Sequence, residues 1–215
     1  MDPEKVNKIK DAVRRNFDSS PVQYDEFEAR YGFFKSLNAA LLKSINSERA
    51  ESILDIGCGT GASCLQLAQA CPQAGIVGLD NSPAMLQKAR DNCCTDDRIL
   101  FVEGDASALT SCLDRDFDAI IYSASIFLIP DFKESIRQAY GLLKPSGQVG
   151  MTFMDGVYSD AGEHLFSLVE EKLGLGVSLR KAVSLSDLEV FVRSVFDFVS
   201  IHECKFRLPK NQVRE

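Results

Sequence analysis

A short apolar segment that leads into three alternating glycines constrains the fold of this chain more than any other feature of its sequence. Residues 53–56 are typical of a buried strand, and Gly57, Gly59 and Gly61 follow before an apolar helix start at Ala62. Glycine adopts positive φ angles and lets another group approach the backbone closely. A strand that turns so tightly into a helix leaves unpaired N–H groups at the helix N-terminus. The segment therefore predicts a nucleotide-binding cradle.

Strand-like and helix-like segments alternate through the middle of the chain. The expected strands are 53–56, 75–80, 98–103, 117–123 and 148–154. The expected helices between them are 62–71, 83–92 and 131–143, with a turn at 144–147 before the last strand. This alternation predicts an α/β fold, with a doubly wound and mostly parallel sheet covered on both faces. Ligands in such sheets bind beyond the carboxyl ends of the strands.

Helical segments are expected on both sides of this core. Apolar residues from Val6 to Phe17 recur every three or four positions, which predicts one helix, and those from Phe27 to Ile45 predict a second. Near the other end, the sequence predicts helices at 162–173 and 186–195 and a strand from 197 to about 208. We expect a single domain, made of a helical cap at 1–47, a cofactor-binding core at 48–155, and C-terminal helices with an edge strand at 156–215.

Composition narrows the class of partner. The net charge of −7, with 31 acidic and 24 basic residues, argues against nucleic acid or an anionic membrane as the main partner. The N-terminus is charged without an apolar signal segment, and no apolar run could span a bilayer, so a cytoplasmic location is expected. Seven scattered cysteines without a CxxC pair indicate reduced thiols and no metal site. The oligomeric state cannot be inferred.

Two acids follow the next two expected strands. Asp80 closes the second strand, where a carboxylate can accept both ribose hydroxyls. Asp105 follows the third strand, where it can accept a hydrogen bond from an exocyclic amine while the N–H of Ala106 meets a ring nitrogen. Each acid alone could be a helix cap. The glycine loop and the two acids in this order favour a nucleoside ligand.

The loop allows two cofactors. Residues 57–62 satisfy the dinucleotide fingerprint GxGxxA, but the third glycine falls two positions after the second, and Asp55 stands two before the first. That Asp-x-Gly-x-Gly-x-Gly spacing resembles motif I of the class I S-adenosylmethionine-dependent methyltransferases. Residues 77–86, 104–106, 117–121 and 142–147 look like later motifs of that family, with serine at position 146 where the family usually has glycine.

The resemblance covers roughly residues 16–155. The segment from Phe17 to Asp25 is loosely similar to the entry segment of ubiquinone/menaquinone-type and biotin-pathway methyltransferases. The family commonly ends in a two-stranded hairpin, of which only one strand is visible here. Either the last strand is absent or the chain is truncated.

The resemblance implies a Rossmann-like methyltransferase fold with S-adenosylmethionine as cofactor. The implied cofactor contacts are Asp55, Gly57, Cys58, Gly59, Gly61, Asp80, Asn81, Asp105, Ala106 and Ser123. No catalytic base is evident, and this does not argue against an enzyme, because methyl transfer needs a base only when the acceptor carries a proton. The candidates are Tyr24 and Tyr31 in the cap and His164 after the fifth strand, each of which has a structural or surface role as its alternative.

The function expected from this set is methyl transfer to a small-molecule acceptor by in-line displacement, in which positioning supplies much of the catalysis. A non-catalytic or regulatory relative that binds the cofactor is the alternative. A nicotinamide oxidoreductase would need an acid or base in a second lobe, for which the chain leaves no room.

Overall fold

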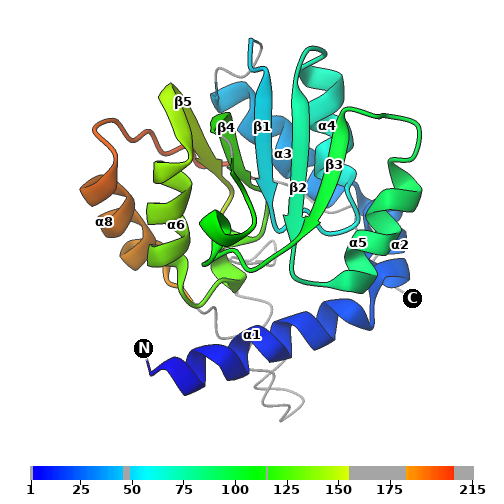
Figure 1. The fold of residues 1–215 in the computed structure, drawn as a ribbon, viewed down its shortest axis with the longest axis horizontal. Coiled ribbons are helices and arrows are strands. Elements are labelled where there is room, and N and C mark those ends of the chain that lie inside the picture. The colour runs from blue at the N-terminus through cyan, green and yellow to red at the C-terminus, as the bar shows by residue number, and fades with distance from the viewer. Residues whose placement is uncertain (1, 46–48, 115, 155–182, 206–215) are drawn as a thin grey trace.

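The computed structural model describes residues 2–45, 49–114, 116–154 and 183–205. Its centre is a sheet of five parallel strands in the order β3-β2-β1-β4-β5 (Figure 1). The strands are β1 (Ser52–Ile56), β2 (Gly75–Asp80), β3 (Ile99–Glu103), β4 (Phe117–Tyr122) and β5 (Leu143–Met151). The order reverses between β1 and β4, which is the switch point where such sheets bind ligands. The expected α/β fold is confirmed.

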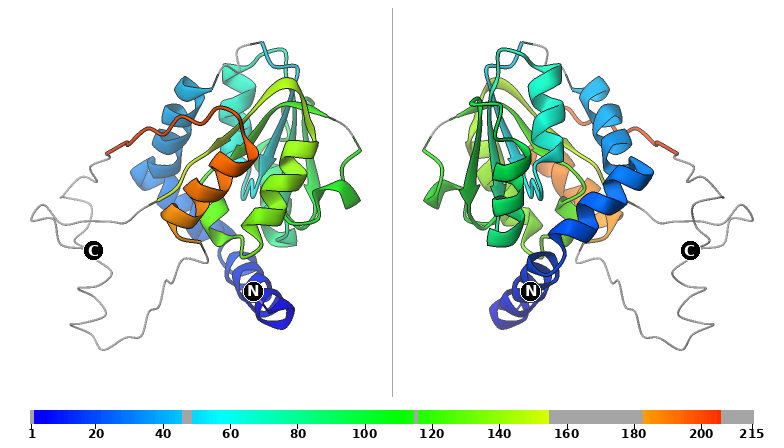
Figure 2. Two further views of the ribbon diagram at one scale, coloured as in Figure 1. Left: turned by 90° about the vertical axis from the view of Figure 1, so that its left-hand side faces the viewer. Right: turned by 90° about the vertical axis from the view of Figure 1, so that its right-hand side faces the viewer.

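Helices cover both faces of the sheet (Figure 2). One face carries α3 (Phe33–Ser44), α4 (Ala62–Ala70) and α5 (Pro83–Asn92), and the other carries α6 (Phe132–Gly141) and α8 (Leu185–Val195). Successive strand residues alternate between the two layers, so that Ile53 packs with the first group and Leu54 with the second. Both side chains are 0% exposed, which explains why the strands are nearly continuous apolar runs.

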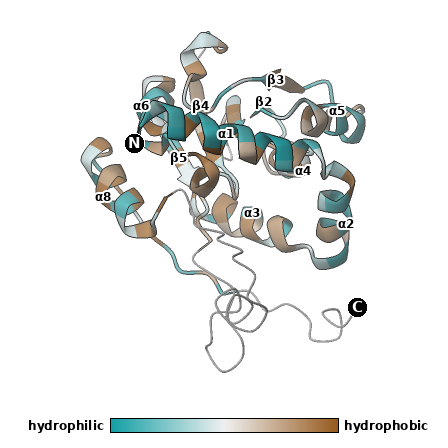
Figure 3. Ribbon diagram, turned by 90° about the horizontal axis from the view of Figure 1, so that it is seen from below, coloured by the Kyte–Doolittle hydropathy of each residue, from teal (hydrophilic) through white to brown (hydrophobic). Residues whose placement is uncertain are grey.

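Two further helices precede the core. They are α1 (Pro3–Asp18) and α2 (Pro21–Tyr31). The Asp2 side chain caps α1 by accepting a hydrogen bond from the N–H of Glu4 at 3.3 Å, and proline occupies the first position of both helices. α1 crosses the carboxyl end of the sheet, as seen in Figure 1 and, from below, in Figure 3.

The expectation of one helix from Phe27 to Ile45 is wrong. Gly32 adopts a φ of +58°, which ends α2 and lets α3 start in a new direction. The Glu28 carboxylate then accepts hydrogen bonds from the N–H groups of Phe34 and Lys35, both at 2.8 Å. An acid from one helix thus caps the next.

Two expectations for the later strands also fail. β5 begins at Leu143 rather than at 148, because Leu143 already pairs with Phe117 of β4. The next pair is Gln148 with Ala119, so the residues of the expected turn form an irregularity inside the strand. No strand forms over 197–205, where Phe198 is 85% exposed and no neighbouring strand of the described residues pairs with the segment. The helix expected at 162–173 and the end of that strand, 206–208, lie outside the described residues, whereas α8 confirms the helix expected at 186–195.

Within the described ranges, none of the helices combines the length and the apolar character that crossing a bilayer requires. The same ranges contain no cluster of three or more His, Cys, Asp or Glu side chains placed to hold a metal ion.

Candidate functional site

The glycine loop joins β1 to α4 through three residues with positive φ. Gly57, Gly59 and Gly61 have φ angles of +74°, +54° and +83°, a region that other residues rarely adopt. A Cβ on Gly57 would lie 2.5 Å from the side chain of Ser125, and one on Gly61 would lie 2.8 Å from a neighbouring sulfur. A Cβ on Gly59 would meet no atom nearer than the Tyr24 ring, at 4.0 Å. Gly59 therefore faces the space in front of the loop, while the other two glycines pack against protein.

Asp55 lies beneath this loop. Its carboxylate is fully buried, and Oδ2 accepts hydrogen bonds from the Ser63 hydroxyl and, at 3.4 Å, from the Cys64 thiol. Oδ1 has no hydrogen-bond partner among the described residues. Burial, only partly offset by the hydrogen bonds, raises the pKa of Asp55 to about 6. A nearby cation would stabilise the ionised form, so the orphaned oxygen fits the α-ammonium group of the expected cofactor.

Asp80 ends β2 and reaches the loop from the other side. Its Oδ2 accepts a hydrogen bond from the N–H of Gly59 at 2.9 Å, and its Oδ1 accepts one from the N–H of Ser82 at 2.9 Å. Burial raises the pKa of Asp80 against the opposing effect of these bonds. An ionised carboxylate offers about four lone-pair sites. Asp80 can therefore hold the loop and still accept two ribose hydroxyls.

Asp105 follows β3 and is paired with the first helix. The Nζ of Lys10 lies 2.8 Å from Asp105 Oδ2 and 3.3 Å from Asp131 Oδ2, and it donates to the Ser107 hydroxyl at 2.5 Å. Burial acts to raise the pKa of Asp105, but the hydrogen bonds from Lys10 and Ser107 bring it below its ordinary value. The carboxylate expected to bind an exocyclic amine is thus engaged by α1.

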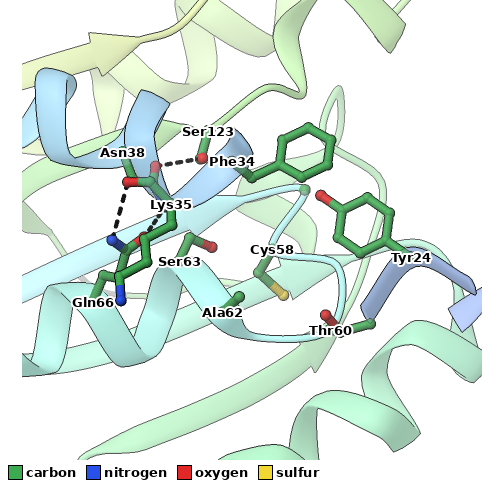
Figure 4. A pocket seen from close by; sticks show the side chains of 11 residues that line it. Tyr24, Phe34, Lys35, Asn38, Cys58, Thr60, Ala62, Ser63, Gln66 and Ser123 are labelled. Carbon is green, nitrogen blue, oxygen red and sulfur yellow. Dashed lines mark hydrogen bonds between the residues drawn. The ribbon is translucent and has the colours of Figure 1, made fainter. Parts of the chain in front are cut away.

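Two pockets lie at the carboxyl end of the sheet. The smaller has a volume of about 20 Å³ and is enclosed by the loop, α3 and α4 (Figure 4), which gives room for roughly one water-sized group. The larger, of about 350 Å³, lies between α1 and the carboxyl ends of β2 and β3, a size typical of a ligand pocket. Its lining residues are Asn7, Lys10, Asp11, Arg14, Asn81 and Asp105.

The structure brings half of the expected cofactor contacts to the walls of these pockets. Gly57, Cys58 and Ser123 line the smaller pocket, and Asn81 and Asp105 line the larger one. Between the two pockets, the backbone of Gly59 is bonded to Asp80. Gly61 is the N-cap of α4, and Ala106 packs, partly buried, against the core. The larger pocket has a size that fits a nucleoside, whereas the smaller one holds no more than a water-sized group.

The three candidate catalytic residues have different environments. Tyr24 lines the smaller pocket and stacks on Phe34 at 4.9 Å between ring centroids. Burial raises the pKa of Tyr24 well above its ordinary value, which favours the neutral phenol. Tyr31 packs on Phe27, with 4.8 Å between the ring centroids. It is not among the described residues that line the two pockets. His164 lies outside the described residues.

Several polar residues of the smaller pocket were not identified from the sequence. Asn38 is 4% exposed; its Oδ1 accepts from the Ser123 hydroxyl at 2.5 Å and its Nδ2 donates to Gln66 Oε1 at 3.1 Å. A signal was present, because Asn38 interrupts the apolar helix face formed by Phe34 and Leu41.

A second buried hydroxyl belongs to the loop itself. Thr60 is 1% exposed and lines the smaller pocket, and its Oγ1 has no hydrogen-bond partner among the described residues. A buried polar atom without a partner is costly. Together with Asp55 Oδ1, it marks the loop as a place where a ligand can supply missing hydrogen bonds.

The Lys10 contacts give a testable result. Lys10→Met is expected to raise the affinity for S-adenosylhomocysteine by up to about fivefold. A partly exposed ion pair is worth up to about 1 kcal/mol, and the expected contact of Asp105 with the adenine would require this pair to break. Isothermal titration calorimetry at two salt concentrations measures this. Lys8→Met is the matched control, because Lys8 lies on the same helix and pairs with Glu4 within it. An unchanged or weaker affinity in Lys10→Met would show that α1 does not compete with the cofactor.

The chain is similar in sequence to known methyltransferases. A family model described as a methyltransferase domain matches residues 53–147, which contain the glycine loop, Asp80 and Asp105. A malonyl-[acyl-carrier protein] O-methyltransferase from Priestia megaterium is 27% identical over 211 residues, which cover 96% of this chain and 74% of the relative. A trans-aconitate 2-methyltransferase from Methylobacterium radiotolerans is 33% identical over 141 residues, which cover 65% of this chain and 51% of the relative. This chain thus spans about half the length of the second relative.

A solved structure has the same fold. It is the putative methyltransferase in complex with the Haloferax volcanii Trm112 methyltransferase activator. The TM-score is 0.63 at 22% identity, and the match covers 85% of this chain and 75% of that one. At this identity the likeness concerns the arrangement of the sheet and its helices.

Proposed function

We propose that this chain, a class I S-adenosylmethionine-dependent methyltransferase with S-adenosylmethionine as its cofactor, methylates a small, soluble acceptor molecule. The observation that carries the proposal is the meeting of the glycine loop, Asp80 and Asp105 at the carboxyl ends of β1, β2 and β3, under a helical cap. The division into a cap at 1–47, a core at 48–155 and a C-terminal part at 156–215 remains part of this proposal.

Each contact has a physical role in holding the cofactor. Asp80 would accept the ribose hydroxyls, and Asp105 would accept the adenine amine after Lys10 releases it. Gly59 leaves space in front of the loop, and Asp55 supplies negative charge beneath it. When bound, the cofactor supplies a methyl group on a sulfonium, which is already activated for displacement. The protein then has to orient the acceptor and exclude water.

The cap supports a small acceptor. One wall of the smaller pocket is aromatic and consists of Tyr24 and Phe34. A second aromatic pair lies near the ends of β4 and β5, where the ring centroids of Phe127 and Phe153 are 5.9 Å apart. Acids outnumber bases by 31 to 24 in the whole chain, whereas a nucleic-acid methyltransferase needs cations along its substrate groove. The relative from Methylobacterium radiotolerans is named for a small acceptor, trans-aconitate.

Labelled-methyl transfer tests the proposal. The protein and methyl-labelled cofactor should be incubated in parallel with a small-metabolite extract, bulk RNA, bulk DNA and a protein fraction that contains acyl carrier protein. We expect transfer to the small-metabolite fraction that changes little between low and moderate salt. The Asp80→Ala variant is the control for transfer by a contaminant. Robust, salt-sensitive transfer to RNA or DNA with none to metabolites would overturn the proposal, and so would transfer to protein alone.

A further inference from the structure

We propose that α2 is a gate over the cofactor site, in which the Tyr24 ring occupies space that the cofactor takes when it binds. The inference rests on the proposed placement of the cofactor across the glycine loop, and it adds how access to that site is controlled. It does not depend on the identity of the acceptor. In the closed position of the gate, α2 has to swing away from the loop before the cofactor can enter.

The Tyr24 ring stands against the ligand-facing side of the glycine loop (Figure 4). A Cβ on Gly59 would have one described atom within 4 Å, and that atom belongs to the Tyr24 ring. Tyr24 also stacks on Phe34, with 4.9 Å between the ring centroids. Between these rings and the loop about 20 Å³ remains, whereas ligand pockets commonly have about 300 Å³ or more. The ring and a bound cofactor therefore exclude each other.

The closed position leaves two polar atoms beneath the ring without partners. Asp55 Oδ1 and Thr60 Oγ1 are buried and form no hydrogen bond with any described residue. Tyr24 faces this region, because its pKa is raised by burial and, among other charges, by those of Asp55 and Asp80. An aromatic ring keeps bulk water away from the two atoms without replacing its hydrogen bonds. A ligand that displaces the ring can form the bonds that the closed position lacks.

Polar contacts with α5 hold the gate closed. Asp25 Oδ2 accepts a hydrogen bond from Asn92 Nδ2 at 3.1 Å and lies 3.7 Å from Lys88 Nζ. Asn92 Nδ2 also donates to the carbonyl oxygen of Thr60 at 3.0 Å. One side chain of α5 thus joins the gate to the glycine loop, and Asp25 acts as the latch.

The gate can move without disturbing the sheet, because none of the side chains of α2 is buried. Segments that bury little surface open at a low cost in free energy. Gly32, with a φ of +58°, joins α2 to α3, and a Cβ on it would meet no described atom within 4 Å. The Glu28 carboxylate caps α3 beside this joint. The Gly32 end is therefore the pivot, and the end that carries Tyr24 and Asp25 moves, with Ser20 as the second joint.

Association kinetics test the gate. Surface plasmon resonance should give the association rate constant and the Kd of S-adenosylhomocysteine for the wild type and for variants of the ring and the latch. We expect Tyr24→Ala to bind about five- to tenfold faster than the wild type and no more weakly, because apparent affinity rises with the fraction of molecules whose site is open. Asp25→Ala keeps the ring and loses the latch, so it should bind about two- to fivefold faster, as for the loss of a partly exposed ion pair.

Two control variants belong to the same helix. Tyr24→Phe keeps the ring and should match the wild type, and so should Glu26→Ala, because Glu26 is an exposed acid outside the latch. Thermal unfolding checks that each variant is folded. Fluorine NMR then reports on the ring itself, because the chain has five tyrosines and the 3-fluorotyrosine signal of Tyr24 is the one that Tyr24→Phe lacks. Saturating S-adenosylhomocysteine should shift this signal and leave that of Tyr140, exposed on α6, in place.

Three results would overturn the gate. Tyr24→Ala and Asp25→Ala could associate at the wild-type rate, or the Tyr24 signal could stay in place while S-adenosylhomocysteine binds. Weaker binding of Tyr24→Ala without faster association would show that the ring is a wall of the bound site and not a plug. If the wild type binds no S-adenosylhomocysteine, the cofactor assignment fails together with the gate. Failure of the small-acceptor proposal is a separate outcome, because it appears in the transfer assay and not in these rates.

Discussion

Asp55→Asn is expected to remove the contribution of Asp55 to the pH dependence of stability, a decrease of about 3 kcal/mol in the free energy of unfolding as the pH rises from about 4 to about 6. Burial raises the pKa of Asp55 from 3.8 to about 6. Between these values the unfolded chain has lost the proton while the folded one still holds it, so the free energy of unfolding falls as the pH rises. Each unit of pKa shift corresponds to about 1.4 kcal/mol. Below pH 4 Asp55 is protonated in both states and has no such effect.

Urea unfolding at a series of pH values measures this difference. The slope of stability with pH is the quantity to compare, because asparagine also changes the hydrogen bond with Ser63 at every pH. Asp91→Asn, at an exposed position of α5, is the control and should keep the wild-type slope. With saturating S-adenosylhomocysteine the wild-type loss should shrink, because an ammonium near Oδ1 favours the ionised carboxylate. Identical slopes in wild type and Asp55→Asn would contradict the burial of an unpaired charge here.

The sheet could be predicted from the sequence because its signals are local. Each strand from β1 to β4 is a short apolar run that ends at a glycine, an acid or a serine. The start of α5 carries a local signal of its own, the cap Ser82 with proline after it. The sequence also placed Asp80 and Asp105 at adjacent strand ends, since parallel strands bring their carboxyl ends to one edge. These features depend on a few neighbouring residues.

The predictions that were wrong concern elements whose limits depend on residues far away in the sequence. The break at Gly32 is invisible to helical periodicity, because apolar residues continue on both sides at helix spacing. The start of β5 is set by its register against Phe117, and a strand at 197–205 would need a neighbour that the described residues do not provide. The periodicity of apolar residues does not reveal which strand a segment pairs with.

The same limit applies to the site. Lys10 belongs to an amphipathic helix and looks like a surface residue in the sequence, yet it reaches across 95 positions to Asp105. Asn38 meets Ser123 across 85 positions. The motifs therefore predicted the acids that we propose hold the nucleoside, whereas the cationic and amide groups that come from the cap are defined only by the folded arrangement.

Asp80→Ala is expected to weaken the binding of S-adenosylhomocysteine by about 2–3 kcal/mol, which is roughly 30- to 150-fold, because two hydrogen bonds to a charged group contribute about 1.5 kcal/mol or less each. Calorimetric titration measures the loss, and thermal unfolding shows whether the variant is folded. Glu103→Ala is the matched control, since Glu103 pairs in register with Asp80 at the end of β3 and is exposed. That variant should bind within about twofold of the wild type, as surface substitutions do.

A second ligand separates the ribose contact from the loop contact, because Asp80→Ala also removes the acceptor for the Gly59 N–H. The analogue of S-adenosylhomocysteine without the two ribose hydroxyls should bind the wild type weakly and lose little more in Asp80→Ala. The difference between the two losses is the coupling energy of the carboxylate with the hydroxyls. If both ligands lose the same factor, Asp80 acts by holding the glycine loop, and the ribose must be bound elsewhere.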